Sequence, residues 1–149
     1  MILDELKAQF GEEIESAVWQ EPFGSAQGEL RLRLRPASLV AVCRLCKERG
    51  YSYLSDITAV DTGSEMRVVY RLVSLQDGGQ VVISVGVPRT GGSLPSLTSV
   101  FQGANWTERE VYDLFGVRFQ GHPDLRRILL TDDWEGHPML KGSSAAGGQ

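Results

Sequence analysis

Residues 51–87 read YSYLSDITAVDTGSEMRVVYRLVSLQDGGQVVISVGV, and this stretch decides the fold. Runs rich in β-branched and aromatic residues, at 51–60, 66–75 and 80–87, alternate with two turn-forming segments, 61–64 and 76–79. Runs of this kind joined by short turns containing glycine and aspartate are typical of consecutive β-hairpins. The stretch therefore predicts neighbouring antiparallel strands in the middle of the chain.

Two helices and two further strands are predicted before this stretch. Residues 2–10 indicate a short helix ended by a glycine, and residues 14–20 are a weaker strand candidate. Leucines alternate with charged residues over 29–35, which is the pattern of a half-buried strand. Pro36 then begins a second helix, because proline is tolerated in a first helical turn, and Gly50 ends it.

The last predicted helix covers Trp106–Phe115, with Asn105 as its N-cap and Glu108 as its partner in a capping box. The element order is thus α-β-β-α-β-β-β-α, which predicts the α+β class with two layers and a largely antiparallel sheet. We expect an α+β domain over 1–117, an extended partner-docking arm over 118–141 and a flexible terminus over 142–149.

Composition restricts the kinds of partner. The 149 residues carry a formal net charge of −4, so general attraction to nucleic acid is not expected. The first residues lack the basic and apolar regions of a signal peptide, and no apolar run reaches the ~20 residues of a membrane helix. We expect a chain on the cytoplasmic side that meets a membrane only through a partner.

Cys43 and Cys46 form a C-x-x-C pair, for which a redox or zinc role has to be weighed. Redox pairs of this spacing lie at a helix N-terminus, whereas this pair falls about two turns inside its helix, on the apolar face. Zinc needs four ligands, and only His122 and His137, both distant in sequence, could join. Core packing is therefore the favoured interpretation, with a thiol or zinc module as the alternative.

The third helix carries a group of carboxylates, Glu108, Glu110 and Asp113. Arg109 lies four residues before Asp113, so an ion-paired helix surface is the default interpretation, ahead of a catalytic carboxylate pair. His122 and His137 each precede a proline, but no nucleophile elbow accompanies them. No dinucleotide-binding or phosphate-loop motif is present. We therefore expect no catalytic, cofactor-binding or metal-binding residues in this chain.

The arm is rich in apolar residues yet has no sustained period. Long irregular segments in compact domains are usually functional or disordered. Two interpretations follow: the arm lies on a partner, or it packs along its own domain. Arg126 and Arg127 are expected to make charge-assisted contacts across an interface or back to Asp113 and Glu110.

Part of the chain resembles a known family. Residues 105–117 (NWTEREVYDLFGV), 119–129 (FQGHPDLRRIL) and 132–138 (DDWEGHP) are similar to the signature of the C subunit of NADH-quinone oxidoreductase, the 30 kDa subunit family of respiratory complex I. Residues 53–61 are similar to its central strand. After Pro138 the family usually continues Leu-Arg-Lys-Asp, whereas this chain reads MLKGS and lacks that arginine and aspartate.

The resemblance implies a cofactor-free structural and assembly subunit in the peripheral arm of the complex. It would dock on the large, hydrogenase-derived subunit beside the quinone site. NADH, FMN, iron–sulfur clusters and quinone would belong to the whole complex, which couples electron transfer to ion translocation. The alternative is the homologous subunit of a membrane-bound nickel–iron hydrogenase, or of a related complex with another electron donor.

The signature also implies which residues bind partners. They are Trp106, Glu108, Arg109, Glu110, Asp113, Phe115, Gly116, Gly121, His122, Pro123, Asp124, Arg126, Arg127, Asp132, Asp133, Trp134, Gly136, His137 and Pro138.

Overall fold

The computed structural model describes residues 2–20, 28–131 and 133–140. The elements follow in the order α1 (Ile2–Phe10), η1 (Gly11–Glu13), β1 (Ile14–Gln20), β2 (Glu29–Leu34), η2 (Pro36–Ser38), α2 (Leu39–Glu48), β3 (Tyr53–Asp61), β4 (Met66–Val73), β5 (Gln80–Val87), β6 (Ser93–Pro95), α3 (Ala104–Phe115) and β7 (Arg118–Gln120), where η marks a short 3-10 helix. The predicted succession of helices and strands is confirmed, and β6 and β7 are additions to it.

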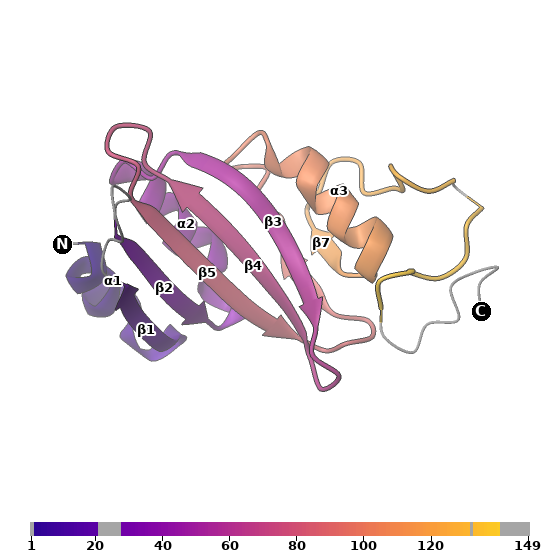
Figure 1. The fold of residues 1–149 in the computed structure, drawn as a ribbon, viewed down its shortest axis with the longest axis horizontal. Coiled ribbons are helices and arrows are strands. Elements are labelled where there is room, and N and C mark those ends of the chain that lie inside the picture. Colours follow the sequence, from indigo (N-terminus) through magenta and orange to yellow (C-terminus); the bar gives the residue numbers. More distant parts are fainter. Residues whose placement is uncertain (1, 21–27, 132, 141–149) are drawn as a thin grey trace.

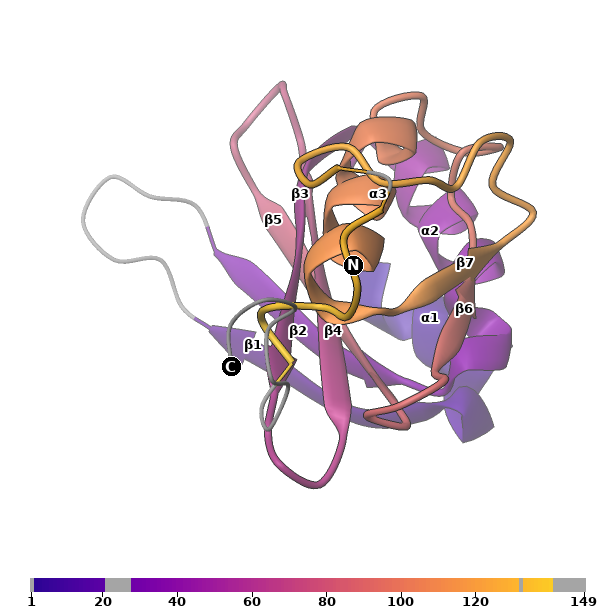
Figure 2. The same ribbon diagram turned by 90° about the vertical axis from the view of Figure 1, so that its right-hand side faces the viewer.

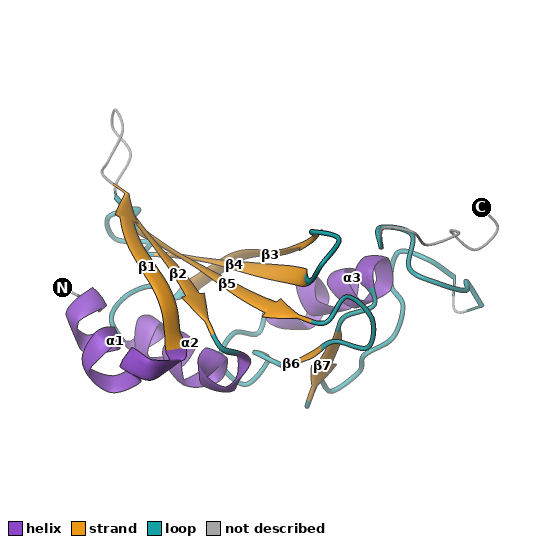
Figure 3. Ribbon diagram, turned by 90° about the horizontal axis from the view of Figure 1, so that it is seen from below, coloured by secondary structure: helices purple, strands orange, loops and turns teal. Residues whose placement is uncertain are grey.

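The main sheet has five strands in the order β1-β2-β5-β4-β3. All neighbouring strands are antiparallel except β2 and β5, which are parallel because α2 and the β3–β4 hairpin intervene between them in the chain. Helices α1 and α2 cover one face of the sheet, and α3 lies beyond the edge strand β3 (Figures 1 and 3). The predicted α+β class with a mostly antiparallel sheet is confirmed.

The core lies between the sheet and the helices. The leucines of β2, at positions 30, 32 and 34, are at most 2% exposed, so the predicted alternation is confirmed. Burying a leucine contributes roughly 1.5–3 kcal/mol, which favours the register in which β2 pairs with β1 and β5. On α2 the buried face includes Leu39, Val42 and the two cysteines.

A second, small sheet was not predicted. Strands β6 and β7 pair in parallel, with Leu94 opposite Phe119, and both side chains are buried. The β6 residues fall between the strand predicted over 80–87 and the helix predicted from Trp106, where no strand was predicted, and β7 belongs to the predicted arm. Elements of three residues carry no readable period, so only the tertiary contact reveals them. Figure 2 shows the pair beside α3.

Candidate partner-binding site

Helix α3 begins at Ala104, two residues before the predicted start, and its N-cap is Gly103. No side chain makes a capping hydrogen bond there, so the predicted cap by Asn105 and the capping box are wrong. Asn105 instead offers its main-chain oxygen to the imidazole of His122, 2.9 Å away. The start of α3 is therefore held from outside the helix.

Glu108 is fully buried and turned away from the helix start. Its carboxylate accepts hydrogen bonds from the Ser96 hydroxyl at 2.6 Å and the Leu97 N–H at 2.7 Å. Burial raises the pKa of Glu108, and the two hydrogen bonds and the nearby His122 offset part of that effect. Glu108 therefore fastens the loop after β6 to α3.

We expect the free energy of unfolding of the Glu108→Gln variant to depend less on pH than that of the wild type. A carboxyl group with a raised folded-state pKa contributes stability at pH values below its unfolded pKa, and that contribution is lost as the pH rises through the folded value. Between these two pKa values, urea unfolding should show a smaller decline of the free energy of unfolding with pH for Glu108→Gln than for the wild type. Glu110→Gln, two residues on, is the control, and equal pH slopes for Glu108→Gln and the wild type would contradict the prediction.

Asp113 is a buried carboxylate surrounded by hydrogen-bond donors of the arm. Its side chain is fully buried and accepts a hydrogen bond from Arg127 at 2.7 Å. The main-chain N–H groups of residues 128, 129 and 130 donate to its second carboxylate oxygen at 3.1, 2.7 and 2.9 Å. We call Asp113, Arg127 and these N–H groups the Asp113 clamp. Burial alone raises the pKa of Asp113, but the hydrogen bonds from Arg127 and from the N–H groups outweigh it and lower the pKa.

The expected ion-paired surface on α3 is therefore wrong for Glu108 and Asp113, which are both buried. Arg109 does not pair with Asp113 either. It donates to the main-chain oxygens of Arg126 and Arg127 at 3.2 and 3.1 Å, and its guanidinium lies 5.9 Å from the ring centre of Trp106. An acidic and a basic residue of α3 thus both hold the arm, on successive turns of the helix.

The two arginines of the arm have different surroundings. Arg127 is 11% exposed and, besides Asp113, donates to the Gly136 main-chain oxygen at 2.7 Å. Arg126 is 66% exposed and pairs with Asp124 at 2.9 Å. The expected contact back to α3 is confirmed for Arg127 and its Asp113 partner. Within the described ranges, neither arginine contacts the expected alternative partner, Glu110.

Both histidines fasten the arm to α3. His122 accepts the Asp124 N–H at its Nδ1 atom, 2.9 Å away, so its Nε2 atom donates to the Asn105 oxygen. His137 places its Nδ1 atom 3.1 Å from the Asp113 main-chain oxygen. Gly116 ends α3 at φ +83°, and a Cβ there would lie 2.7 Å from the His137 ring. The predicted helix end is confirmed, and it also makes room for this histidine.

The arm therefore runs along α3 and exposes apolar side chains outward. Leu129 and Met139 of the arm are each more than half exposed, as is Trp106 of α3, whereas Leu125 and Leu140 pack against the core. Phe115 is half-buried at the end of α3. Asp132 and residues 141–149 lie outside the described residues. The other predicted residues on described arm segments are Gly121, Pro123, Asp133, Trp134, Gly136 and Pro138. The partners that sequence reasoning missed are Ser96 and main-chain groups of the arm, which leave no pattern in the sequence.

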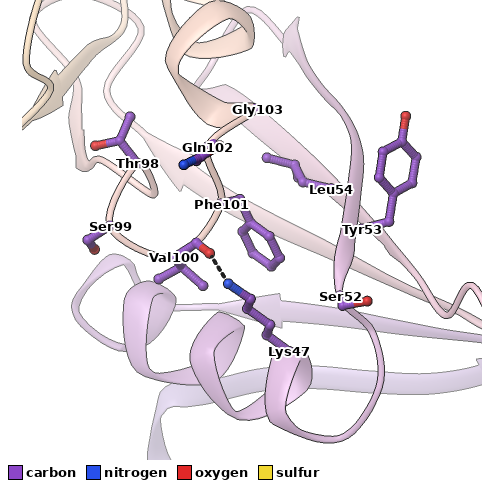
Figure 4. A pocket seen from close by; sticks show the side chains of 10 residues that line it. All are labelled: Lys47, Ser52, Tyr53, Leu54, Thr98, Ser99, Val100, Phe101, Gln102 and Gly103. Carbon is purple, nitrogen blue, oxygen red and sulfur yellow. Dashed lines mark hydrogen bonds between the residues drawn. The ribbon is translucent and has the colours of Figure 1, made fainter.

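A cavity of about 550 Å³ lies between the end of α2, the start of β3 and the loop before α3 (Figure 4). Lys47 is the only charged side chain in its lining. Its ammonium group donates to the Val100 oxygen at 2.6 Å and lies 5.6 Å from the centre of the Phe101 ring. The lysine thus holds the loop against α2. The residues that line the cavity include no other basic side chain and no carboxylate.

Cys43 and Cys46 are free thiols that are completely buried, so the predicted core position is confirmed. Burial raises the pKa of Cys43 well above its ordinary value and that of Cys46 to about 12. Within the described ranges, no group of three or more histidine, cysteine or acidic side chains is placed to hold a metal ion. None of the helices in the described part of the chain is long and apolar enough to cross a bilayer.

The double variant Cys43→Ala with Cys46→Ala should unfold with a free energy lower by roughly 1–3 kcal/mol in total, as small buried truncations do. Assembly with a partner, and any activity of that assembly, should survive, because a buried thiol with a raised pKa is a poor nucleophile and ligand. Denaturant titration and a complex assay measure the two effects. Arg44→Ala, on the exposed side of α2, is the control; lost activity at unchanged stability would favour a redox role.

The fold and the clamp define an α+β domain with an arm folded along its last helix, and a solved structure shares this fold. It is described as Nqo5 of a trypsin-resistant fragment (1–134), is 32% identical, covers 83% of this chain and 96% of its own, and has a TM-score of 0.64. The chain belongs to the family of the 30 kDa subunit of respiratory-chain NADH dehydrogenase, whose model matches residues 32–149.

Two relatives agree with this assignment. The C subunit of NADH-quinone oxidoreductase from Geobacter metallireducens is 42% identical over 120 residues, which are 77% of this chain and 74% of the relative. The C/D subunit of NADH-quinone oxidoreductase from Methylococcus capsulatus is 40% identical over 134 residues, covering 81% of this chain but 23% of that protein. The chain is thus similar both to a separate subunit and to part of a longer protein.

Proposed function

We propose that this chain is a non-catalytic structural and assembly subunit in the peripheral arm of NADH-quinone oxidoreductase. It docks on the large, hydrogenase-derived subunit next to the quinone site, on the cytoplasmic side of the membrane. NADH, FMN, the iron–sulfur clusters and quinone are bound by other subunits. The observation that carries the proposal is the Asp113 clamp, which fixes an irregular arm on α3 while Leu129 and Met139 remain exposed.

The outward side of the arm has the chemistry of an interface. Exposed aromatic and aliphatic side chains beside arginine are enriched at the centres of protein–protein contacts. Docking of a second protein over this side would bury these exposed side chains.

The name and length of the Methylococcus relative support the choice of partner. There, the region similar to this chain is less than a quarter of a protein whose name joins the letters C and D. Two subunits joined in one chain work in close proximity, because a short covalent link gives them a high effective concentration. The partner we propose for this chain is accordingly the separate subunit that corresponds to the D part.

Hydrogen exchange with and without the large subunit tests the docking. We expect the amides of residues 133–140 to exchange more slowly once the large subunit is bound, while those of β4 stay unchanged. Unchanged exchange over the arm in a complex that has formed would show that the arm serves only its own domain.

Purification of the tagged chain from its native host separates the proposal from its alternatives. The assembled complex should oxidise NADH with quinone as acceptor, and the chain alone should carry no flavin or iron. A complex that evolves hydrogen and lacks NADH activity would favour the hydrogenase alternative. Stoichiometric zinc or iron on the isolated chain would favour a metal module.

A further inference from the structure

The strand β3 forms one edge of the main sheet, because it is last in the strand order and pairs only with β4. Along its other side, the main-chain N–H and C=O groups are not used by the sheet. An exposed strand edge is a ready template for another strand. The main-chain groups on the outer side of β3 are therefore available to a further strand.

Helix α3 runs beside this edge (Figure 1). A groove of about 290 Å³ is lined by residues of both elements. The groove is lined by Ile57, Thr58 and Ala59 of β3 and by Glu110, Val111, Leu114 and Phe115 of α3. The lining is mainly aliphatic and aromatic. A groove between an edge strand and a helix is the geometry in which an extended peptide adds to a sheet, with main-chain hydrogen bonds on one side and a side-chain pocket on the other.

Charge narrows the choice of occupant. Glu110 is the only ionisable side chain that lines the groove, it is half-buried, and no ion pair joins it to any described residue. A carboxylate at the side of an apolar groove favours an occupant with a basic residue at that point, because charge complementarity fixes the register of a bound segment.

The segment that follows Leu140 in the sequence suits the groove poorly. Met139 donates its N–H to the oxygen of Leu114, a groove residue, at 2.8 Å. The residues that follow Leu140 read KGSSAAGGQ and contain no apolar side chain larger than alanine. An aliphatic groove gains little free energy from such a segment, since burial of apolar area supplies the gain.

We propose that this groove takes an extended segment of a neighbouring subunit, which adds as an extra strand beside β3. One aliphatic side chain of the segment fills the space between Ile57 and Leu114, and a lysine or arginine pairs with Glu110. The inference rests on the proposed function, because it takes the chain to work inside a complex. It names a second contact of the chain, separate from the arm.

Hydrogen exchange of the full chain, free and in the purified complex, tests the added strand. We expect amides within residues 57–59 to exchange on the order of tenfold more slowly in the complex, because main-chain hydrogen bonds protect them. Unchanged exchange in an assembled complex would overturn the inference and leave the proposed function intact. Protection already present in the free chain and lost on truncation after Leu140 would also overturn it, since the chain's own end would then be the occupant.

Charge reversal provides the second measurement. The complex lacking this subunit is offered full-length chain, and Glu110→Lys should bind on the order of tenfold more weakly than the wild type, because it sets like charges against each other. Glu12→Lys makes the same charge change at an exposed position in η1, at the α1 end of the molecule, and should bind as the wild type does. Equal binding of both variants would overturn the basic contact and with it the proposed occupant.

Discussion

Replacing Asp113 with alanine should lower the free energy of unfolding by about 3–5 kcal/mol, because it leaves the largely buried Arg127 guanidinium without its counter-ion. It also removes the acceptor of the N–H groups of residues 128–130. Urea unfolding measures the loss, and hydrogen exchange should locate it in residues 126–140. The change thus removes four hydrogen bonds to one carboxylate.

Two further variants make the Asp113 result specific. Asp113→Asn keeps one oxygen acceptor and should lose less stability than Asp113→Ala. Asp124→Ala removes a carboxylate that is half exposed and pairs with the exposed Arg126, so it should cost no more than about 1 kcal/mol. Similar losses for Asp113→Ala and Asp124→Ala would mean that the clamp contributes little.

The clamp also has a pH dependence whose sign differs from that of Glu108. The folded-state pKa of Asp113 is lowered, so its contribution is present above the unfolded pKa and is lost as the pH falls through the folded value. Lowering the pH should therefore release the arm in the wild type. In Asp113→Asn, the stability of the arm should not show this dependence on pH.

Arg127→Ala should impair assembly with the large subunit far more than Arg126→Ala does. Arg127 joins Asp113 to the Gly136 oxygen, so its loss frees the part of the arm around residues 127–136, whereas Arg126 makes a surface ion pair. A loss of about 3–5 kcal/mol in the interaction that orders the arm corresponds to binding weaker by on the order of a hundredfold or more. Titration of the large subunit with each variant measures the difference.

The two arginine variants are neighbours in sequence and carry the same charge change, so net charge cannot explain a difference between them. Arg127→Lys adds a check: it keeps the charge but loses the two-pronged contact, and it should fall between the wild type and Arg127→Ala. Thermal unfolding of each variant shows whether the domain remains folded. Normal assembly of both Arg126→Ala and Arg127→Ala would remove the docking role of the arm.

The sheet was predictable because its strands are long enough to show their burial. The alternation in β2 and the hairpin turns between β3, β4 and β5 come directly from which side chains meet the core. The strands β6 and β7 were missed, since three residues cannot show a period and each strand is defined only by the other. Local pattern therefore predicts an element well when that element carries its own hydrophobic face.

The partner-binding role of the site residues stays a prediction, and the structure shows that several of them make contacts that the sequence did not indicate. A spacing of four between Arg109 and Asp113 favours a surface pair on an isolated helix, and tertiary contact overrides it here. The actual partners of both residues include main-chain atoms of the arm, and those atoms are the same in nearly every amino acid. Side-chain patterns contain no information about such partners. The end of α3, by contrast, was predictable because Gly116 is a glycine.

The clamp grips residues 128–130 by their N–H groups, and this has a consequence for sequence variation. Every amino acid except proline offers the same N–H, so these positions can change side chains without altering the course of the chain. Leu129, whose side chain is largely exposed to solvent, is therefore free to be matched to a different neighbour while Asp113 and Arg127 stay fixed. Anchoring and recognition are thus assigned to different atoms of the same three residues, so that one can diverge among relatives without endangering the other.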